Sequence, residues 1–130
     1  MAIRVVRLGD TRLPDEGVRL GTVRRPPRGV NKKDFSRLDY YDVWVPDIAP
    51  SAQLLSWANA DDWTDARWKK YEGMYLREMK EPHAKRLIGL LAILSRDSNF
   101  SVGCYCEDES RCHRSLLRNL LEDAGAVIRE

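Results

Sequence analysis

Three segments within the first 45 residues either alternate hydrophobic and polar side chains or are rich in β-branched and aromatic residues. They are residues 3–8, 18–23 and 40–45, and their patterns are typical of β-strands. Glycine or proline follows each segment, and the prolines after the second and third remove backbone hydrogen-bond donors. The pattern therefore predicts three short strands separated by turns or loops.

The middle of the chain changes to the spacing of hydrophobic residues that is typical of α-helices. Ser51 is a suitable N-cap for a helix over residues 52–60, and Thr64 or Asp62 is suitable for the next helix. That second helix carries a stripe at near-helical spacing, formed by Trp68, Tyr71, Tyr75 and Met79. Such a stripe nearly always packs into the core, so we assign these residues no function. Pro82 suits the first turn of a third helix.

The strand pattern returns at residues 100–106. Alternation along this segment places Cys104 and Cys106 on one face. Ser110 is the predicted N-cap of a following helix over residues 111–123, which carries a stripe of leucines.

This succession of elements, with a last short strand expected at residues 126–128, predicts an α/β sandwich in a single domain of residues 1–130. The sheet is expected to be mixed and partly parallel, with helices packed on it. In such sheets, ligands collect beyond the carboxyl ends of the strands. The segment that follows residue 104 lies at such an end.

Composition narrows the class of protein. The 130 residues suffice for one core but not for two, and 43% hydrophobic with 32% charged residues is ordinary for a soluble globular protein. No apolar run reaches the roughly 18 residues of a membrane helix, so the membrane is not an expected partner. An odd number of cysteines without a secretory signal favours a reducing compartment, and we expect a cytoplasmic protein.

A net charge of +2 is too small for the surface as a whole to attract nucleic acid, so any binding of nucleic acid would require a local basic segment. One basic segment exists between residues 19 and 37, where Asp34 is the only acid. Its cations are Arg19, Arg24, Arg25, Arg28, Lys32, Lys33 and Arg37. The segment is either a solvated loop or a binding surface for anions.

All three cysteines lie with one histidine between residues 104 and 114, which makes this the most chemically specific part of the chain. Cys112 is predicted in the first turn of a helix, where the helix dipole and two flanking arginines would lower the pKa of its thiol. It is therefore a candidate nucleophile. Three consecutive acidic residues, 107–109, oppose that effect.

The same segment could bind a metal or simply pack. Cys104, Cys106, Cys112 and His113 are four ligands of types that zinc accepts. Their spacing is awkward, because consecutive helical side chains diverge by about 100°, so we expect no cofactor and no stoichiometric zinc. As packing groups, Cys104 would be a small buried residue and His113 a hydrogen-bonded one. However, His113 and Arg114 would crowd cations at a helix N-terminus, which is unfavourable unless an anion is present.

Three parts of the chain resemble the prokaryotic family known as domain of unknown function 488, and together they span most of the sequence. They are Thr22–Gly29, Tyr41–Ser51 and Cys104–Leu117. The recurring motifs of that family are an early arginine-proline segment and a late Cys-x5-Cys-His-Arg stretch. The resemblance implies a fold but no reaction. It also implies that relatives differ in their number of cysteines. Arg28, His113 and Arg114 are therefore better candidates for site residues than the cysteines are.

Our leading hypothesis is a small-molecule enzyme or binding protein with a site where residues 25–29 meet residues 106–114. The ligand would be anionic, a phosphate or a nucleotide-like molecule. We expect Arg25, Arg28, Ser110 and Arg114 to bind the anion, Cys112 and His113 to act as nucleophile and proton carrier, and Cys104 and Cys106 to support them. The alternative is a non-catalytic module that binds nucleic acid or protein, in which the cysteine cluster is structural.

Overall fold

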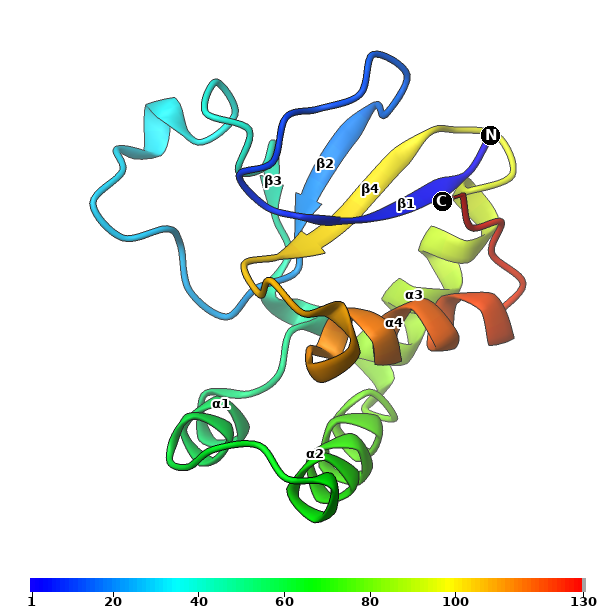
Figure 1. The fold of residues 1–130 in the computed structure, drawn as a ribbon. Coiled ribbons are helices and arrows are strands. Elements are labelled where there is room, and N and C mark those ends of the chain that lie inside the picture. Colours follow the sequence, from blue (N-terminus) through cyan, green and yellow to red (C-terminus); the bar gives the residue numbers. More distant parts are fainter. Residues whose placement is uncertain (130) are drawn as a thin grey trace.

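A computed structural model describes residues 1–129 and shows four strands in one sheet (Figure 1). The strands are β1 (Ile3–Arg7), β2 (Val18–Gly21), β3 (Val43–Trp44) and β4 (Phe100–Cys104), in the order β1-β4-β2-β3. All three strand pairings are parallel. The α/β class is confirmed, whereas the mixed sheet is wrong for the described strands. The loop after β1 carries the chain back to the end of the sheet at which β1 begins, so β2 runs in the same direction as β1. In the sheet, β4 lies between these two strands.

Four helices follow the predicted pattern. They are α1 (Ala52–Asn59), α2 (Asp65–Glu78), α3 (Pro82–Leu94) and α4 (His113–Asp123). The Ser51 and Thr64 side chains cap α1 and α2 by accepting from the backbone N–H of Leu54 and Arg67. Among residues 1–129, no helix combines the length and apolar character needed to cross a bilayer.

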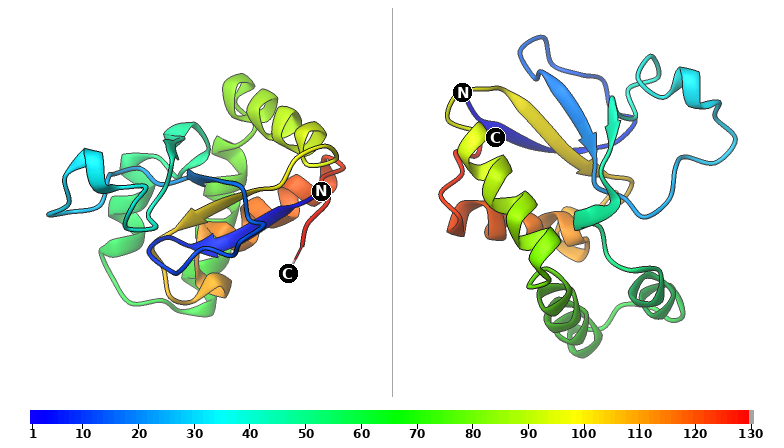
Figure 2. Two further views of the ribbon diagram at one scale, coloured as in Figure 1. Left: turned by 90° about the horizontal axis from the view of Figure 1, so that it is seen from above. Right: turned by 180° about the vertical axis from the view of Figure 1, so that it is seen from behind.

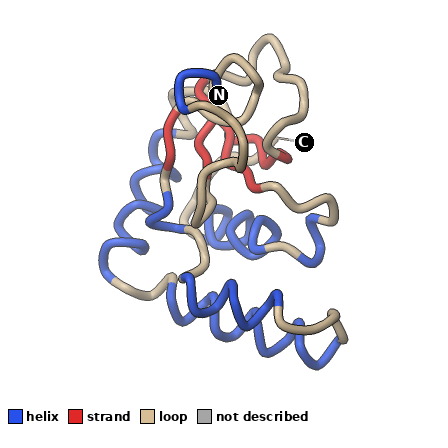
Figure 3. Tube along the Cα trace, turned by 90° about the vertical axis from the view of Figure 1, so that its left-hand side faces the viewer, coloured by secondary structure: helices blue, strands red, loops and turns tan. Residues whose placement is uncertain are grey.

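The helices α3 and α4 cover one face of the sheet, and α1 and α2 form a pair beyond its carboxyl end (Figures 1 and 2). Ile3, Phe100 and Val102 of the sheet pack there against Leu117 and Leu121 of α4 in the main core. Figure 3 shows loops and short helical turns, rather than long helices, on the other side of the strands. A smaller core contains Leu8, Val23, Tyr41, Cys104 and Cys112.

The segment around the cysteines differs from the prediction in three ways. β4 ends at Cys104, so Cys106 lies in the loop after the strand. Ser110 lies in a 3₁₀ turn (η3, Glu109–Arg111) and bonds Asp108, so it does not cap α4. Cys112 occupies the N-cap position with φ −134° and ψ 149°, so α4 begins at His113.

Residues 126–129 lie beside the start of β1, as Figure 1 shows. The expected strand at residues 126–128 is reduced to a single bridge between Ile3 and Ile128. The segment is too short to form a ladder after α4, although it hydrogen-bonds to the first strand on both sides of that residue pair.

Candidate functional site

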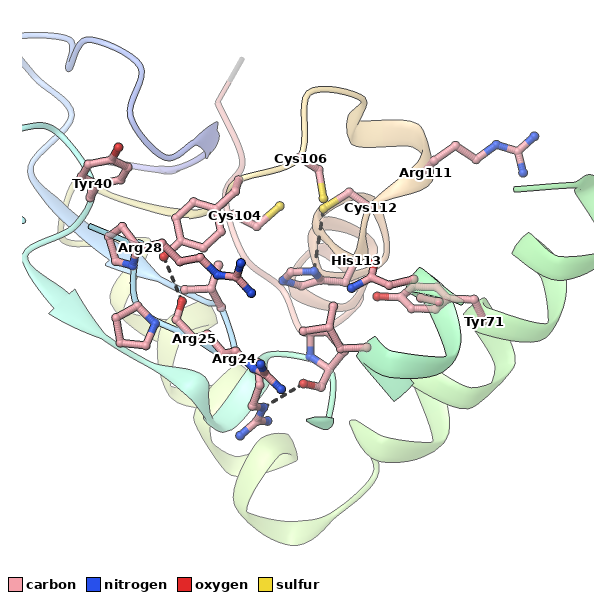
Figure 4. Close-up of a pocket in the computed structure, with 18 of the residues that line it drawn as sticks. Arg24, Arg25, Arg28, Tyr40, Tyr71, Cys104, Cys106, Arg111, Cys112 and His113 are labelled. Carbon is pink, nitrogen blue, oxygen red and sulfur yellow. Dashed lines mark hydrogen bonds between the residues drawn. The ribbon is translucent and has the colours of Figure 1, made fainter. Parts of the chain in front are cut away.

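A cavity of about 490 Å³ opens at the carboxyl ends of β2 and β4 (Figure 4). One wall is formed by residues 23–28 after β2, and another by residues 104–106 and 111–113 around the start of α4. The remaining wall comes from α1, α2 and the loop between them, and it includes Leu55, Trp63 and Tyr71. This is the edge at which open parallel sheets bind ligands.

The three cysteine sulfur atoms meet on one side of this cavity, and all lie within 4.8 Å of one another. Cys104 and Cys112 are each only 2% exposed, whereas Cys106 is exposed. All three thiols are free. Three separate elements therefore supply one cluster: the end of β4, the loop after it and the N-cap of α4.

The thiols of the cluster differ in their readiness to ionise. Hydrogen bonds from Cys104 and Cys112 lower the pKa of Cys106 to about 3, and the positive charge of Arg114 adds to this effect. The hydrogen bond with Cys106 is the first cause of a strongly raised pKa at Cys104. At Cys112, the bond with Cys104 lowers the pKa, but the bond with Cys106 and burial outweigh it and raise the pKa to about 12. Without a metal, the geometry thus favours Cys106 over Cys112 as the thiolate.

His113 is buried at the start of α4, next to the cluster. Its Nε2 lies 2.7 Å from the carbonyl oxygen of Thr22, and its Nδ1 lies 3.7 Å from the sulfur of Cys112. Because a carbonyl only accepts hydrogen bonds, Nε2 must carry the hydrogen and Nδ1 is left as an acceptor facing Cys112. Burial lowers the pKa of His113, so the ring is neutral at pH 7.

Arg114 does not lie in the same cavity as Arg28. Its side chain is only 4% exposed, and its guanidinium donates to the backbone oxygen of Cys106. Arg114 lines a second cavity of about 550 Å³, together with Arg7, Arg19 and Glu107. The structure therefore separates the two arginines that were expected to hold one anion.

The other predicted anion ligands also divide into two groups. Arg25 and Arg28 are exposed and line the cavity that contains the thiols. Ser110 is exposed, and both its hydroxyl and its backbone N–H donate to Asp108. The cysteines, His113, Arg25 and Arg28 are thus brought to one cavity, while Ser110 and Arg114 lie elsewhere.

Sequence reasoning missed several residues of the cavity. Arg24 donates to the backbone oxygens of Pro50 and Pro46 at 2.9 and 3.1 Å, which holds the arginine-proline loop in place. The hydroxyl of Tyr105, between two cysteines, donates to the backbone oxygen of Arg25 at 2.9 Å. The position of Tyr105 in the cysteine segment was the only available signal, since the backbone partners of both side chains are set by tertiary contacts.

Aromatic residues of the α1–α2 pair form the apolar wall. The rings of Trp63 and Tyr71 lie 5.4 Å apart in an edge-to-face arrangement, and both residues line the cavity. Tyr71 is 3% exposed, as its predicted place in the core requires, yet one side of it borders the cavity. At the rim, Arg111 pairs with Asp65 at 2.7 Å, which joins the start of α2 to the loop before α4.

Comparisons with known proteins identify the family. No curated protein and no solved structure gives a significant match to the chain. A family model described as the active DUF488-N3 subclade matches residues 3–125, which is nearly the whole chain. The chain therefore belongs to the domain of unknown function 488 family, in the subclade described as active.

Proposed function

We propose that this protein is a small-molecule enzyme that binds an anionic, nucleotide-like ligand in the cavity beside the thiol cluster. One observation carries the proposal: a single cavity is lined by all three cysteines, His113, Arg25 and Arg28. Convergence of reactive and cationic side chains on one concave site is the usual mark of a binding or active site.

The cationic rim supports an anionic ligand. Arg25 and Arg28 are both exposed at the cavity. Guanidinium groups match phosphate and carboxylate geometry with paired hydrogen bonds. The loop that carries them is held by Arg24 and Tyr105, so the two cations are presented on a fixed backbone.

The opposite wall supports a ligand with a flat apolar part. Leu55, Trp63 and Tyr71 lie there, and the cavity volume of about 490 Å³ is in the range of small-molecule sites. Aromatic side chains stack favourably on flat rings such as nucleobases. A nucleotide-like molecule would place its phosphate at the arginines and its base at this wall.

The floor of the cavity supports catalysis over simple binding. An exposed cysteine, two buried cysteines and a neutral histidine lie together there. The matched subclade is described as active. Three free cysteines also suit a reducing compartment, and we place the protein in the cytoplasm on that ground.

The alternative of a nucleic-acid-binding module receives less support from the basic segment. Arg19 is buried and pairs with Glu16 at 2.7 Å. Arg24 binds backbone oxygens, and Arg37 pairs with Asp34 at 3.2 Å. Three of the seven cations in residues 19–37 are thus engaged within the protein, and two of the others line the cavity.

A thermal-shift experiment tests the proposal. Adenosine monophosphate, adenosine, sugar phosphates and inorganic phosphate would be compared as probes on the full chain, because a ligand that binds only the folded state raises the melting temperature. We expect a phosphate-containing probe to stabilise the parent. The shift should be smaller in Arg28→Leu and unchanged in Lys33→Leu, a matched exposed cation of the same segment that does not line the cavity.

Binding of nucleic acid, without stabilisation by a small molecule, would contradict the proposal. If no small molecule stabilises the protein while single-stranded DNA or RNA binds it with a steep salt dependence, the cavity proposal is wrong and the binding module is favoured.

A further inference from the structure

We propose that Cys104, Cys106 and Cys112 together bind one zinc ion, with a fourth coordination position that faces the cavity. This metal site goes beyond the proposed function and does not depend on which small molecule the cavity binds. It is argued from the positions of the three sulfur atoms, the backbone that places them, the charge beside them and their access to the cavity.

The sulfur positions fit a tetrahedral ion. Zinc–sulfur bonds are about 2.3 Å long, so two sulfur ligands of a tetrahedral site lie about 3.8 Å apart. The three sulfur atoms already lie within 4.8 Å of one another. Side-chain movements of about an ångström or less would therefore close them around the ion. Thiolates are also the ligands that zinc and other soft cations prefer.

The fold removes the objection that sequence spacing raised against a metal. That objection assumed that Cys112 and the residue after it are consecutive helical positions. Cys112 instead has an extended backbone at the N-cap, with φ −134° and ψ 149°. Cys104 ends β4, and Cys106 follows it in the loop. All three side chains can therefore point to a common centre.

A buried cation balances the charge of such a site. One Zn²⁺ with three thiolates carries a net charge of −1, and any protons left on the sulfurs go to solvent when the ion binds. Arg114 lies beside the cluster and is only 4% exposed. Within residues 1–129, its Nε has no hydrogen-bond partner, and Glu109 is the one carboxylate whose charge acts on the guanidinium. Buried charges are normally paired, and the metal–thiolate group would place an anion directly beside this guanidinium.

The exposure of the three cysteines leaves one side of the site open. Cys104 and Cys112 are buried and would hold the ion from within, whereas Cys106 is exposed at the cavity wall. The three sulfurs form a group that His113 does not complete, because only Cys112 is within contact of its Nδ1. Catalytic zinc sites keep three protein ligands and one open position, while structural sites have four. The open position here would take water or an atom of the bound small molecule.

The test is the metal content of the untagged full chain, measured by elemental analysis after zinc loading and removal of unbound metal. We expect about one zinc per chain in the parent and in Ser110→Ala, a control in the same loop whose hydroxyl bonds only Asp108. Cys106→Ser should lose the zinc, and because Cys106 is exposed in a loop, this variant should still fold.

Cobalt provides a second measurement that needs no variant. Replacement of zinc by Co²⁺ in the parent should produce sulfur-to-metal charge-transfer bands and the strong visible absorption of a tetrahedral site. A folded parent that binds neither metal overturns the inference, and so does stoichiometric zinc that persists in folded Cys106→Ser. Stabilisation by small-molecule probes is measured in a separate experiment. The metal proposal can therefore be wrong while the cavity proposal is right, and the cavity proposal can be wrong while the metal proposal is right.

Discussion

His113 and Thr22 join the start of α4 to the end of β2 through a buried contact of 2.7 Å between the imidazole Nε2 and the carbonyl oxygen. This contact fixes the tautomer of the ring and directs Nδ1 toward Cys112. It also connects the two segments that carry the family motifs, since the arginine-proline loop follows Thr22 and the cysteine segment surrounds His113. This hydrogen bond therefore helps to set the geometry of the cavity floor.

Replacement of His113 should reveal the contribution of this hydrogen bond to stability. His113→Leu leaves the buried oxygen of Thr22 without its donor, which costs about 1–3 kcal/mol. His113→Gln can place an amide N–H near the position of Nε2 and should lose less. Urea unfolding at pH 7 of the parent and both variants measures the difference. A His113→Leu variant as stable as the parent would show that the contact with Thr22 contributes nothing.

Cys106 should be the first thiol to react in metal-free protein. It is exposed and has a pKa lowered to about 3 by hydrogen bonds from the neighbouring thiols, whereas Cys104 and Cys112 are buried. Limiting iodoacetamide at neutral pH, followed by peptide mass spectrometry, identifies the modified residue. Zinc loading should slow the reaction, because a coordinated thiolate is a poorer nucleophile. Initial modification of Cys112 would contradict the arrangement described here.

The buried pair of Arg19 and Glu16 should be a strong determinant of stability. Their side chains are 1% and 2% exposed, their closest atoms lie 2.7 Å apart, and Ser101 donates to the same carboxylate. Arg19→Met leaves the carboxylate buried without its partner and should cost about 3–5 kcal/mol.

The double variant Arg19→Met with Glu16→Gln is the matched control for this pair. It removes both charges and should recover part of the loss, as measured by urea unfolding at pH 7. If it is no more stable than Arg19→Met alone, the loss does not arise from an unpaired charge.

Asp42 should make stability depend on pH in the acid range. Burial alone would raise its pKa, but hydrogen bonds from Arg12, the backbone N–H of Arg19 and Ser36 lower it from 3.8 to about 2. Because the pKa is lower in the folded state, the ionised carboxylate stabilises the fold above pH 3.8, and this contribution is lost as pH falls toward 2.

Unfolding midpoints between pH 2 and pH 6 test the role of Asp42. Asp42→Asn should be less stable than the parent at pH 6 and should show a smaller loss at lower pH. Asp97→Asn, an exposed carboxylate after α3, should follow the parent. An identical acid dependence in Asp42→Asn and the parent would rule out this carboxylate as a source.

The candidate site could be located from the sequence because its chemistry is local. The cysteines, His113 and Arg114 lie within eleven consecutive residues, and two prolines separate Arg25 from Arg28. The cysteine segment indicates the end of a strand and the arginine-proline segment indicates an exposed loop. Both indications depend only on neighbouring residues in the sequence. Their grouping around one cavity was expected for the cysteines, His113, Arg25 and Arg28, and the structure places them there.

The direction in which side chains point could not be found in the same way. Arg114 is one residue from His113 in sequence, but the helical rotation between them sends it to a different cavity. Ser110 has the side chain of a typical N-cap, yet it lies within the 3₁₀ turn Glu109–Arg111 and bonds Asp108. Cys112 therefore occupies the N-cap position of α4. A shift of two residues in the start of a helix thus decides which groups face the thiols.

Local pattern by itself located the four helices and the four strands of the sheet, though not their exact ends, because alternation and capping depend on neighbours along the chain. The Ser51 and Thr64 caps are examples. Only the tertiary structure decided that the strands are all parallel, that Tyr71 of the core stripe borders a cavity, and that three sulfur atoms lie within 4.8 Å. The physical reason is that these relationships arise when distant segments pack together, and packing depends on the shapes and directions of both partners.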